Sequence, residues 1–404
     1  MTSKTLVFDV TKKDFHKTVQ IPTSKSYGNR LLILASLEKK PVRLRNLPRS
    51  TDVLTMIDCL KAIGLEINQE ADDLVISNSF PECEKLNPSH EEIIVFTGDG
   101  GTTTRFLASL LCRGSKTYRI EPSGGMRNRP MTEFLEAAKK LGVNVTSSSE
   151  FWLKIKGPIT LKNAELAVDC SRSTQFATGF AMVCADLGIS IRPVEMNASE
   201  AYYEMTNELI KHRDKTLWEV PVDFSGASYP IALGAVTGEV RLPQIHAADP
   251  FQADAEFLNL LQDIGAQLEW RKDGLVVSKA KLKPFDVDIS RYPDLSPTLC
   301  FLASTIEGES FLRNIEVLRY KETDRVAEMI KVLELYEIEF ELSQNFLKIK
   351  GRPSMECAPK IFHAPEDHRI IMMTYLFMRT FSGGVIHGAE HVKKSFPDFF
   401  KVMD

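Results

Sequence analysis

The sequence predicts an α/β protein of two similar domains, each made of three copies of one repeated α/β unit. Three observations predict this. Apolar runs rich in small residues occur six times, and most are followed by an amphipathic helix with a strand-like tail. The starts of the runs are roughly 55 to 75 residues apart, which is the size expected of one repeated unit. Six such units in 404 residues suit two domains better than one open sheet.

The six apolar runs are predicted to form buried helices. They are almost wholly apolar, which is typical of helices surrounded by protein on all sides. Each follows a polar or Gly-containing turn. The runs lie at 31–37, 105–112, 176–184, 229–237, 297–304 and 369–378. We therefore expect a helical core wrapped by strands and further helices.

A second element, an amphipathic helix followed by a hydrophobic strand, is predicted at 56–67, 134–145, 257–270 and 329–342. In three of the four segments the helical periodicity ends at a Gly, and alternation typical of a strand begins just beyond it. Gly142 followed by Val143 and Val145 is an example. No Pro/Ser-rich linker is visible, and the break between the halves is expected near 220–223.

Composition excludes several classes of protein. With 43% hydrophobic and 26% charged residues, the chain is expected to be soluble and globular. A net charge of −4 provides no general attraction to nucleic acid or to an anionic membrane. The first residues lack the apolar segment of a signal peptide, and no run approaches the roughly 18 apolar residues of a membrane span. We expect a cytoplasmic protein.

The seven cysteines are odd in number and scattered, and none belongs to a C-x-x-C pair. This pattern argues against both a disulfide framework and a zinc site. Several lie inside the apolar runs, where a thiol packs as a small core residue.

The segment 22–30 is a candidate anion site. It places Ser24, Lys25 and Ser26 at the start of a predicted helix, where backbone N–H groups and the helix dipole favour an anion. Arg30 adds a second positive charge. The alternative is an ordinary Ser N-cap with two solvated basic residues.

Similar polar segments precede other predicted helices, at 98–105, 126–131 and 171–175. The first contains three glycines, which let the backbone approach a ligand closely, and Thr102 and Arg105 add a donor and a charge. It matches neither the P-loop nor the G-x-G-x-x-G pattern, so nucleotide binding is not indicated. A tight turn is the alternative.

The second half of the chain contributes the carboxylates. Asp294 precedes a predicted buried helix and serves either as its N-cap or as a partly buried base. Charged segments at 321–325, 366–369 and 393–398 complete eight polar segments; the first of them, taken alone, is typical of a solvated face. Together they offer many cations, a few carboxylates and no metal-ligand cluster. This set favours a substrate with several anionic groups and acid/base chemistry without a metal.

In their order, these motifs resemble those of the 5-enolpyruvylshikimate-3-phosphate synthase family, from residue 20 to the final FPDFF. The family comprises carboxyvinyl transferases of the shikimate pathway, which leads to chorismate and the aromatic amino acids. The resemblance implies two domains of three βαβαββ units each, the enolpyruvyl transferase fold, with the active site in the interdomain cleft. The implied domains are 1–22 with 224–404, and the inserted 23–223.

The resemblance also implies the reaction. The 5-hydroxyl of shikimate 3-phosphate attacks C2 of phosphoenolpyruvate while C3 is protonated, and a proton and phosphate then leave. It implies no cofactor and no metal, two small-molecule substrates, and no nucleic acid or membrane partner. We expect a monomer. Gly101 is retained, which implies inhibition by glyphosate.

The site residues implied by the resemblance fall into three sets. Those for acid/base catalysis are Asp294, Glu322, Lys25, His368 and Lys394. Those for shikimate 3-phosphate are Lys25, Ser26, Arg30, Ser173, Thr174, Gln175, Ser199, Tyr202, Asp294 and Lys321. Those for phosphoenolpyruvate are Lys25, Gly101, Arg129, Arg325, Arg369 and Lys394.

Three positions depart from the family pattern: Asp99 replaces an Asn, Phe106 a Pro, and Val317 an Asn. They leave open a related acceptor, such as another cyclitol. The nearest alternative is UDP-N-acetylglucosamine enolpyruvyl transferase, but the loop at 121–126 lacks its Cys or Asp. A non-catalytic anion-binding relative is a further alternative, against which the presence of Asp294, Glu322 and Lys394 together argues.

Overall fold

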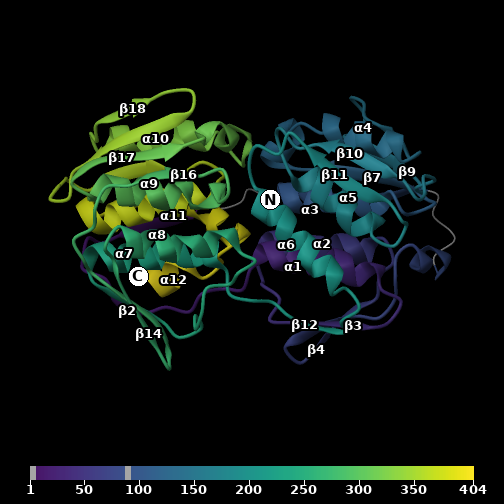
Figure 1. Cartoon of the computed structure of the whole chain (residues 1–404), viewed down its shortest axis with the longest axis horizontal. Helices are drawn as coiled ribbons and strands as arrows, with labels where there is room; N and C mark the ends of the chain where they lie inside the picture. The colour runs from purple at the N-terminus through teal and green to yellow at the C-terminus, as the bar shows by residue number, and fades with distance from the viewer. Residues whose placement is uncertain (1–5, 87–91) are drawn as a thin grey trace. The chain divides into compact units, whose positions relative to one another are not determined.

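The computed structural model describes residues 6–86 and 92–404, and the chain divides into two compact units (Figure 1). We call them the C-terminal unit, Met1–Pro22 with Val222–Asp404, and the inserted unit, Thr23–Pro221. The second junction, between residues 221 and 222, lies two residues before the one that the resemblance implies. Each unit has a hydrophobic core made only of its own residues.

Three buried helices pack against one another in the inserted unit: α1 (Lys25–Leu37), α3 (Gly101–Leu111) and α5 (Gln175–Cys184). They contain the first three apolar runs except for Cys112, so the prediction of buried helices is confirmed here. In α1 every residue from Tyr27 to Ser36 is buried. The polar residues of each motif therefore lie at or near the start of a helix that the core holds in place.

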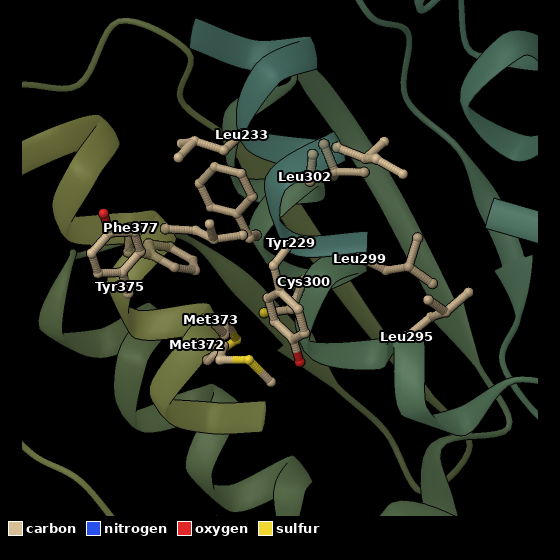
Figure 2. Close-up of a cluster of buried hydrophobic side chains, with 14 of the residues drawn as sticks. Tyr229, Leu233, Leu295, Leu299, Cys300, Leu302, Met372, Met373, Tyr375 and Phe377 are labelled. Carbon is tan, nitrogen blue, oxygen red and sulfur yellow. The ribbon is translucent and has the colours of Figure 1, made fainter. Parts of the chain in front are cut away.

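The C-terminal unit has the same arrangement, with α7 (Phe224–Thr237), α9 (Ser296–Thr305) and α11 (His368–Phe377) in mutual contact. Figure 2 shows the core that they share, which includes Tyr229 and Leu233 of α7, Cys300 of α9 and Met373 of α11. These helices contain most of the last three apolar runs. All seven cysteines of the chain are free thiols, and six of them are buried.

The predicted helix-then-strand elements are confirmed as well. The amphipathic helices are α2 (Thr51–Ala62), α4 (Thr132–Lys140), α8 (Phe257–Asp263) and α10 (Arg325–Leu335). Gly64, Gly142 and Gly265 follow the first three with positive φ, the conformation that favours glycine after a helix. After α10 the position is filled by Glu337 at φ 51°, which explains why the glycine signal is missing there.

Three sheets of the described residues belong to the inserted unit. The first has the order β12-β3-β5-β4, with β12 (Leu217–Glu219), β3 (Val42–Arg45), β5 (Asp73–Ile76) and β4 (Ile67–Glu70). The second has the order β6-β7-β9-β8, with β6 (Glu92–Gly98), β7 (Thr117–Pro122), β9 (Leu153–Lys156) and β8 (Asn144–Thr146). The third pairs β10 (Glu165–Asp169) with β11 (Ser190–Val194), and α6 (Glu200–Lys211) follows.

Three further sheets belong to the C-terminal unit. The first has the order β14-β15-β13-β2, with β14 (Gln267–Arg271), β15 (Gly274–Ser278), β13 (Glu239–Leu242) and β2 (His16–Thr18). The second has the order β16-β17-β19-β18, with β16 (Asp286–Asp288), β17 (Gly308–Arg313), β19 (Phe346–Gly351) and β18 (Phe340–Leu342). The third is β1 (Val7–Val10), β21 (Gly384–His387) and β20 (Lys360–His363), and α12 (Phe399–Met403) ends the chain.

The sheets show the repeat directly. Four share one pattern, in which a parallel pair continues into two antiparallel pairings. The chain order from β6 to β9, and again from β16 to β19, is βαβαββ. In the third repeat of each unit only the first part of this order is present. Near each point where the chain passes from one unit to the other, a strand pairs within its own unit and not with the unit that follows it. The strand β2 precedes α1 but pairs with β13, and β12 precedes α7 but pairs with β3.

Candidate active site

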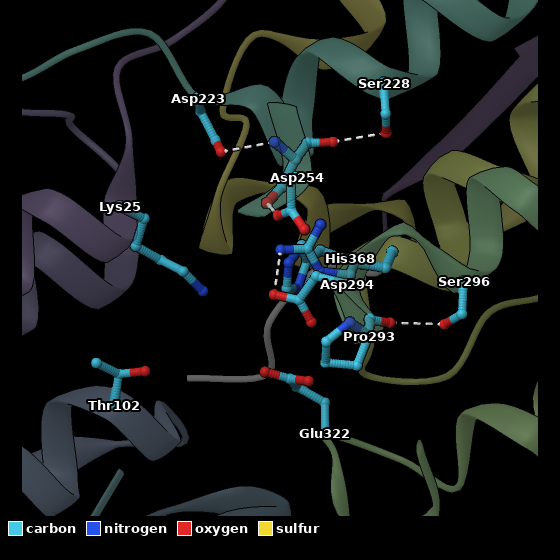
Figure 3. A network of polar contacts seen from close by, with 12 residues as sticks. Lys25, Thr102, Asp223, Ser228, Asp254, Pro293, Asp294, Ser296, Glu322 and His368 are labelled. Atoms are coloured by element: carbon cyan, nitrogen blue, oxygen red, sulfur yellow. Dashed lines mark hydrogen bonds and ion pairs between the residues drawn. The ribbon is translucent and has the colours of Figure 1, made fainter. Parts of the chain in front are cut away.

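The predicted catalytic carboxylates of the C-terminal unit lie in a network of ion pairs, which we call the carboxylate–arginine cluster. It consists of Asp294, Glu322, Arg325, Asp367 and Arg369. Figure 3 labels two of its members, Asp294 and Glu322. Asp294 occupies the short 3-10 helix Pro293–Leu295, directly before α9. Its carboxylate accepts hydrogen bonds from Nη1 of Arg325 at 2.8 Å and from Nη2 of Arg369 at 2.7 Å.

Of the two roles left open for Asp294, the N-cap is not the one observed. Leu295 occupies the N-cap position of α9, and its side chain makes no capping bond. The carboxylate instead bridges two guanidinium groups that come from α10 and α11. Asp294 is thus a partly buried carboxylate in a cationic environment.

Arg325, the first residue of α10, is the centre of the cluster. Its side chain is only 1% exposed and binds three carboxylates: Nε donates to Asp367 at 2.8 Å, Nη1 to Asp294, and Nη2 to Glu322 at 2.5 Å. Such charge-assisted bonds hold both partners in a defined geometry. A buried arginine with three carboxylates leaves the cluster with an excess of negative charge unless Arg369 and Lys321 contribute.

The charges of the cluster shift its pKa values in opposite directions. Burial raises the pKa of Asp294, but Arg369 and Arg325 outweigh it and hold that pKa far below the usual range. Burial lowers the pKa of Arg325, but Asp367, Glu322 and Asp294 raise it above its ordinary value. Asp294 is therefore a carboxylate, and Arg325 a cation, throughout the neutral range.

Three further predicted residues belong to this unit. Burial lowers the pKa of the Lys321 ammonium group, while Asp294 opposes that shift. His368 is buried as the first residue of α11, and its Nδ1 lies 4.0 Å from Asp367. Lys394 is buried at the end of the 3-10 helix Ala389–Lys394. The structure thus brings these predicted residues close enough for their charges to interact: Asp294, Glu322, Arg325, Arg369 and Lys321.

Lys25 lies in the inserted unit as the first residue of α1, after the Ser24 N-cap. The Ser24 hydroxyl accepts from the backbone N–H of Tyr27, as the sequence predicted for a Ser N-cap. The ammonium group of Lys25 binds Asp52 of α2 at 3.0 Å, and both side chains are mostly buried. Lys25 is therefore not a solvated basic residue.

Arg105 of α3 joins the motif 171–175 to the loop before α4. Its Nη1 donates to the Ser173 hydroxyl at 3.2 Å and to Oε1 of Gln175 at 2.8 Å, and its Nη2 donates to the Pro130 carbonyl at 3.3 Å. Gln175 in turn donates to Thr102 at 2.9 Å. The sequence offered Thr102 and Arg105 as ligands for an anion, but here they orient other predicted site residues.

Gly101 makes room for Arg129. A Cβ at Gly101 would overlap Nη1 of Arg129, so the close approach of this guanidinium to the start of α3 needs a glycine. Arg129 also lines a cavity of about 330 Å³ with Trp152 and Leu135. Two residues predicted from separate motifs for phosphoenolpyruvate are thus adjacent.

Arg30 is buried and bound within the inserted unit. It donates to the Thr206 hydroxyl at 2.7 Å, to the Ser26 carbonyl at 2.9 Å and to the Tyr202 carbonyl at 3.1 Å. Burial lowers its pKa to about 10, while Tyr202 and Tyr27 oppose the shift. Ser26 and Tyr202, which were predicted for the same substrate as Arg30, are therefore its direct neighbours.

The two remaining predicted residues, Thr174 and Ser199, lie at the starts of helices. Thr174 is buried at the N-cap position of α5, and Ser199 holds that position of α6 at φ 63°. Neither side chain makes a capping bond. Their hydroxyl groups are thus not used to cap the helices that they begin.

Sequence reasoning missed two carboxylates. Asp52 binds Lys25, and Asp367 binds Arg325 and caps α11 by accepting from the N–H of Arg369 at 2.9 Å. Asp367 stood in a segment already chosen for its charges, so its place before a buried helix was the available signal. Asp52 had only a weak signal, its position in the first turn of an amphipathic helix.

The departures at 106 and 317 also have defined positions. Phe106 is fully buried in α3, and Val317 lies in the 3-10 helix Ile315–Tyr320, partly buried against the core. In the described ranges 6–86 and 92–404, no group of three or more His, Cys, Asp or Glu side chains is placed to hold a metal. Within the same ranges, no helix has both the length and the apolarity that a membrane crossing requires.

The chain is similar to known proteins over nearly its whole length. The family model described as EPSP synthase (3-phosphoshikimate 1-carboxyvinyltransferase) matches residues 10–403. The 3-phosphoshikimate 1-carboxyvinyltransferase of Vibrio campbellii is 30% identical over 411 residues, covering 95% of each chain. That of Thermococcus kodakarensis is 30% identical over 398 residues, covering 94% of each.

Two solved structures share the fold. The EPSP synthase from Acinetobacter baumannii superposes with a TM-score of 0.76 at 20% identity, covering 99% of this chain and 97% of that one. The enolpyruvyl transferase NikO from Streptomyces tendae superposes with a TM-score of 0.74 at 12% identity, covering 99% and 96%. At these identities the likeness concerns the fold, and the predicted enolpyruvyl transferase fold is confirmed.

Proposed function

The chain belongs to the EPSP synthase (3-phosphoshikimate 1-carboxyvinyltransferase) family, and on this premise we propose that it transfers the enolpyruvyl group of phosphoenolpyruvate to the 5-hydroxyl of shikimate 3-phosphate. The hydroxyl oxygen adds to C2 of phosphoenolpyruvate and C3 gains a proton. The tetrahedral intermediate then loses a proton from C3 and phosphate from C2. One group must take a proton and another must give one, close to fixed positive charge.

The carboxylate–arginine cluster is the observation that carries this proposal. It puts two carboxylates that can exchange protons, Asp294 and Glu322, on the same buried guanidinium, Arg325. Arg369 adds a second guanidinium next to Asp294. Anion binding and proton transfer therefore use the same few side chains.

Substrate binding would adjust the proton affinity of Asp294. In the free protein the two arginines hold its pKa too low for an efficient general base. An anionic substrate that binds Arg369 draws this guanidinium away from Asp294, which raises the pKa of the carboxylate toward a useful value. Asp294 then accepts the hydroxyl proton of the acceptor only when phosphoenolpyruvate is in place.

The inserted unit supplies the remaining proposed contacts. Ser173, Gln175, Arg30 and their neighbours hold shikimate 3-phosphate. Gly101 and Arg129 hold phosphoenolpyruvate, and Lys25, oriented by Asp52, contacts both substrates. Lys321, His368 and Lys394 complete the proposed set from the C-terminal unit.

The test is the release of phosphate from phosphoenolpyruvate with and without shikimate 3-phosphate. We expect release only with the acceptor, and no change after dialysis against a chelator, because no cofactor or metal takes part. UDP-N-acetylglucosamine as acceptor is the matched comparison, since the nearest alternative function uses that sugar with the same fold and chemistry. Release with that sugar alone would replace the proposed acceptor, and no acceptor-dependent release at all would contradict the proposed function.

Two finer expectations belong to the same proposal: the enzyme works as a monomer and in the cytoplasm. Light scattering of the purified protein at assay concentration measures its mass, and fractionation of cells locates it. A stable dimer, or recovery with membranes, would contradict them.

A further inference from the structure

Phe106 is one of the three positions at which the sequence departs from the motifs it resembles, and the structure shows what this aromatic ring contacts. It projects from the middle of α3 and is fully buried. The centre of its ring lies 5.2 Å from the guanidinium carbon of Arg30 on α1. That distance is within the range of a cation–π interaction, which strengthens when water is excluded.

Arg30 has a second aromatic neighbour, since the ring of Tyr202 lies 5.9 Å from the same carbon. Three of the five N–H bonds of its guanidinium donate to Thr206, Ser26 and Tyr202. In the described part of the chain the other two have no protein acceptor. Because these N–H bonds lie in one rigid plane, whatever fixes the plane also aims the two remaining donors.

The three hydrogen bonds to protein are all made to neutral oxygen atoms. No carboxylate forms an ion pair with Arg30 among the described residues, in contrast to Arg325. A buried cation without such a partner needs other compensation for its lost hydration. The negative face of an aromatic ring supplies part of it, and a proline at position 106 has no such face.

We propose that Phe106 is a positioning residue for the acceptor: its ring holds the buried Arg30 guanidinium in the orientation that receives an anionic group of shikimate 3-phosphate. This inference rests on the proposed function, in which Arg30 contacts the acceptor. It predicts that loss of the ring weakens acceptor binding selectively. Phosphoenolpyruvate is assigned to other residues, so its binding is not affected.

The experiment compares Phe106→Leu with the wild-type enzyme in the phosphate-release assay. We expect the KM for shikimate 3-phosphate to rise about fivefold, as expected for the loss of one desolvated cation–π contact. The KM for phosphoenolpyruvate and kcat should stay within about twofold. Phe106→Tyr keeps an aromatic face and should restore most of the acceptor affinity.

Phe180→Leu is the matched control. Phe180 is also fully buried in the inserted unit, but its ring stacks on Phe134 at 5.4 Å instead of facing a cation. This variant should lose comparable thermal stability and keep the wild-type KM for shikimate 3-phosphate. If Phe106→Leu is not recovered folded, Phe106→Met removes the ring with a closer match in volume.

The outcomes separate the two proposals. An active wild type whose KM for shikimate 3-phosphate is unchanged in Phe106→Leu, or rises equally in Phe180→Leu, contradicts the role of Phe106 alone. An equal rise in the KM for phosphoenolpyruvate contradicts it too. A wild type without acceptor-dependent turnover contradicts the proposed function itself.

Discussion

At the scale of single residues, the environment of Asp294 decides its chemistry. The sequence placed this carboxylate before a buried helix, where a capping role and a role as a base were both open. Two arginines from helices that follow it by more than 30 residues bind it instead. The low pKa of Asp294 is caused by these two arginines, so replacing either arginine should raise it.

Asp294→Asn should lower turnover by about two to four orders of magnitude, because a general base contributes roughly that much. Retained wild-type turnover would show that Asp294 takes no part in proton transfer. A near-native circular dichroism spectrum of the variant is the control, since an amide keeps the size of the side chain.

The same variant tests the pKa shift. A carboxylate whose pKa is lower in the folded than in the unfolded state stabilises the fold above its unfolded pKa, about 3.9, and this contribution is lost as pH falls through the folded value. In urea unfolding, the difference in free energy of unfolding between the wild type and Asp294→Asn should therefore be constant from pH 7 to about pH 4. Below about pH 4 this difference should become smaller. A deficit that widens on acidification would mean that the sign of the shift is wrong.

At the scale of elements, residues at the starts of helices form much of the candidate site. Asp324 begins α10 by accepting from the N–H of Ala327, and Asp367 begins α11 by accepting from that of Arg369. The two caps look alike in sequence, but Asp367 is fully buried and also binds Arg325. One residue therefore fixes the start of α11 and the geometry of the cluster.

Asp367→Ala should cost about 3–5 kcal/mol in the free energy of unfolding, because it breaks a buried ion pair as well as a cap. Asp324→Ala is the matched control and should cost about 1 kcal/mol, as is typical of a cap whose remaining partner, Arg319, is in solvent. Urea unfolding of both variants measures the difference. Equal losses would show that the bond between Asp367 and Arg325 adds nothing to stability.

At the scale of the whole molecule, each unit encloses its own core, and the chain passes between the units at two points. In each unit a backbone hydrogen bond joins the two chain segments at these points. The N–H of Ser24 donates to the Pro221 carbonyl at 2.7 Å in the inserted unit, and the N–H of Asp223 donates to the Pro22 carbonyl at 2.9 Å in the C-terminal unit. The ends of the inserted unit are thus adjacent, as in a domain that can be excised.

The fragment 23–221 should therefore fold on its own. We expect cooperative urea unfolding and dispersed amide resonances, because its core includes no side chain of the other unit. A fragment that unfolds gradually, or that binds dyes specific for exposed apolar surface, would show that the inserted unit depends on the rest of the chain.

The sequence by itself determined the fold class, the six buried helices, the four helix-then-strand elements and the motifs of the site. These depend on local periodicity and on helix-start chemistry, which neighbouring residues decide. Only the tertiary structure decided the partners: Asp52 for Lys25, two arginines for Asp294, and Phe106 for Arg30. It also decided that β2 pairs with β13 and β12 with β3, strands far apart in the chain. Such pairings join residues far apart in the chain, and their energies depend on burial and distance, which no local pattern specifies.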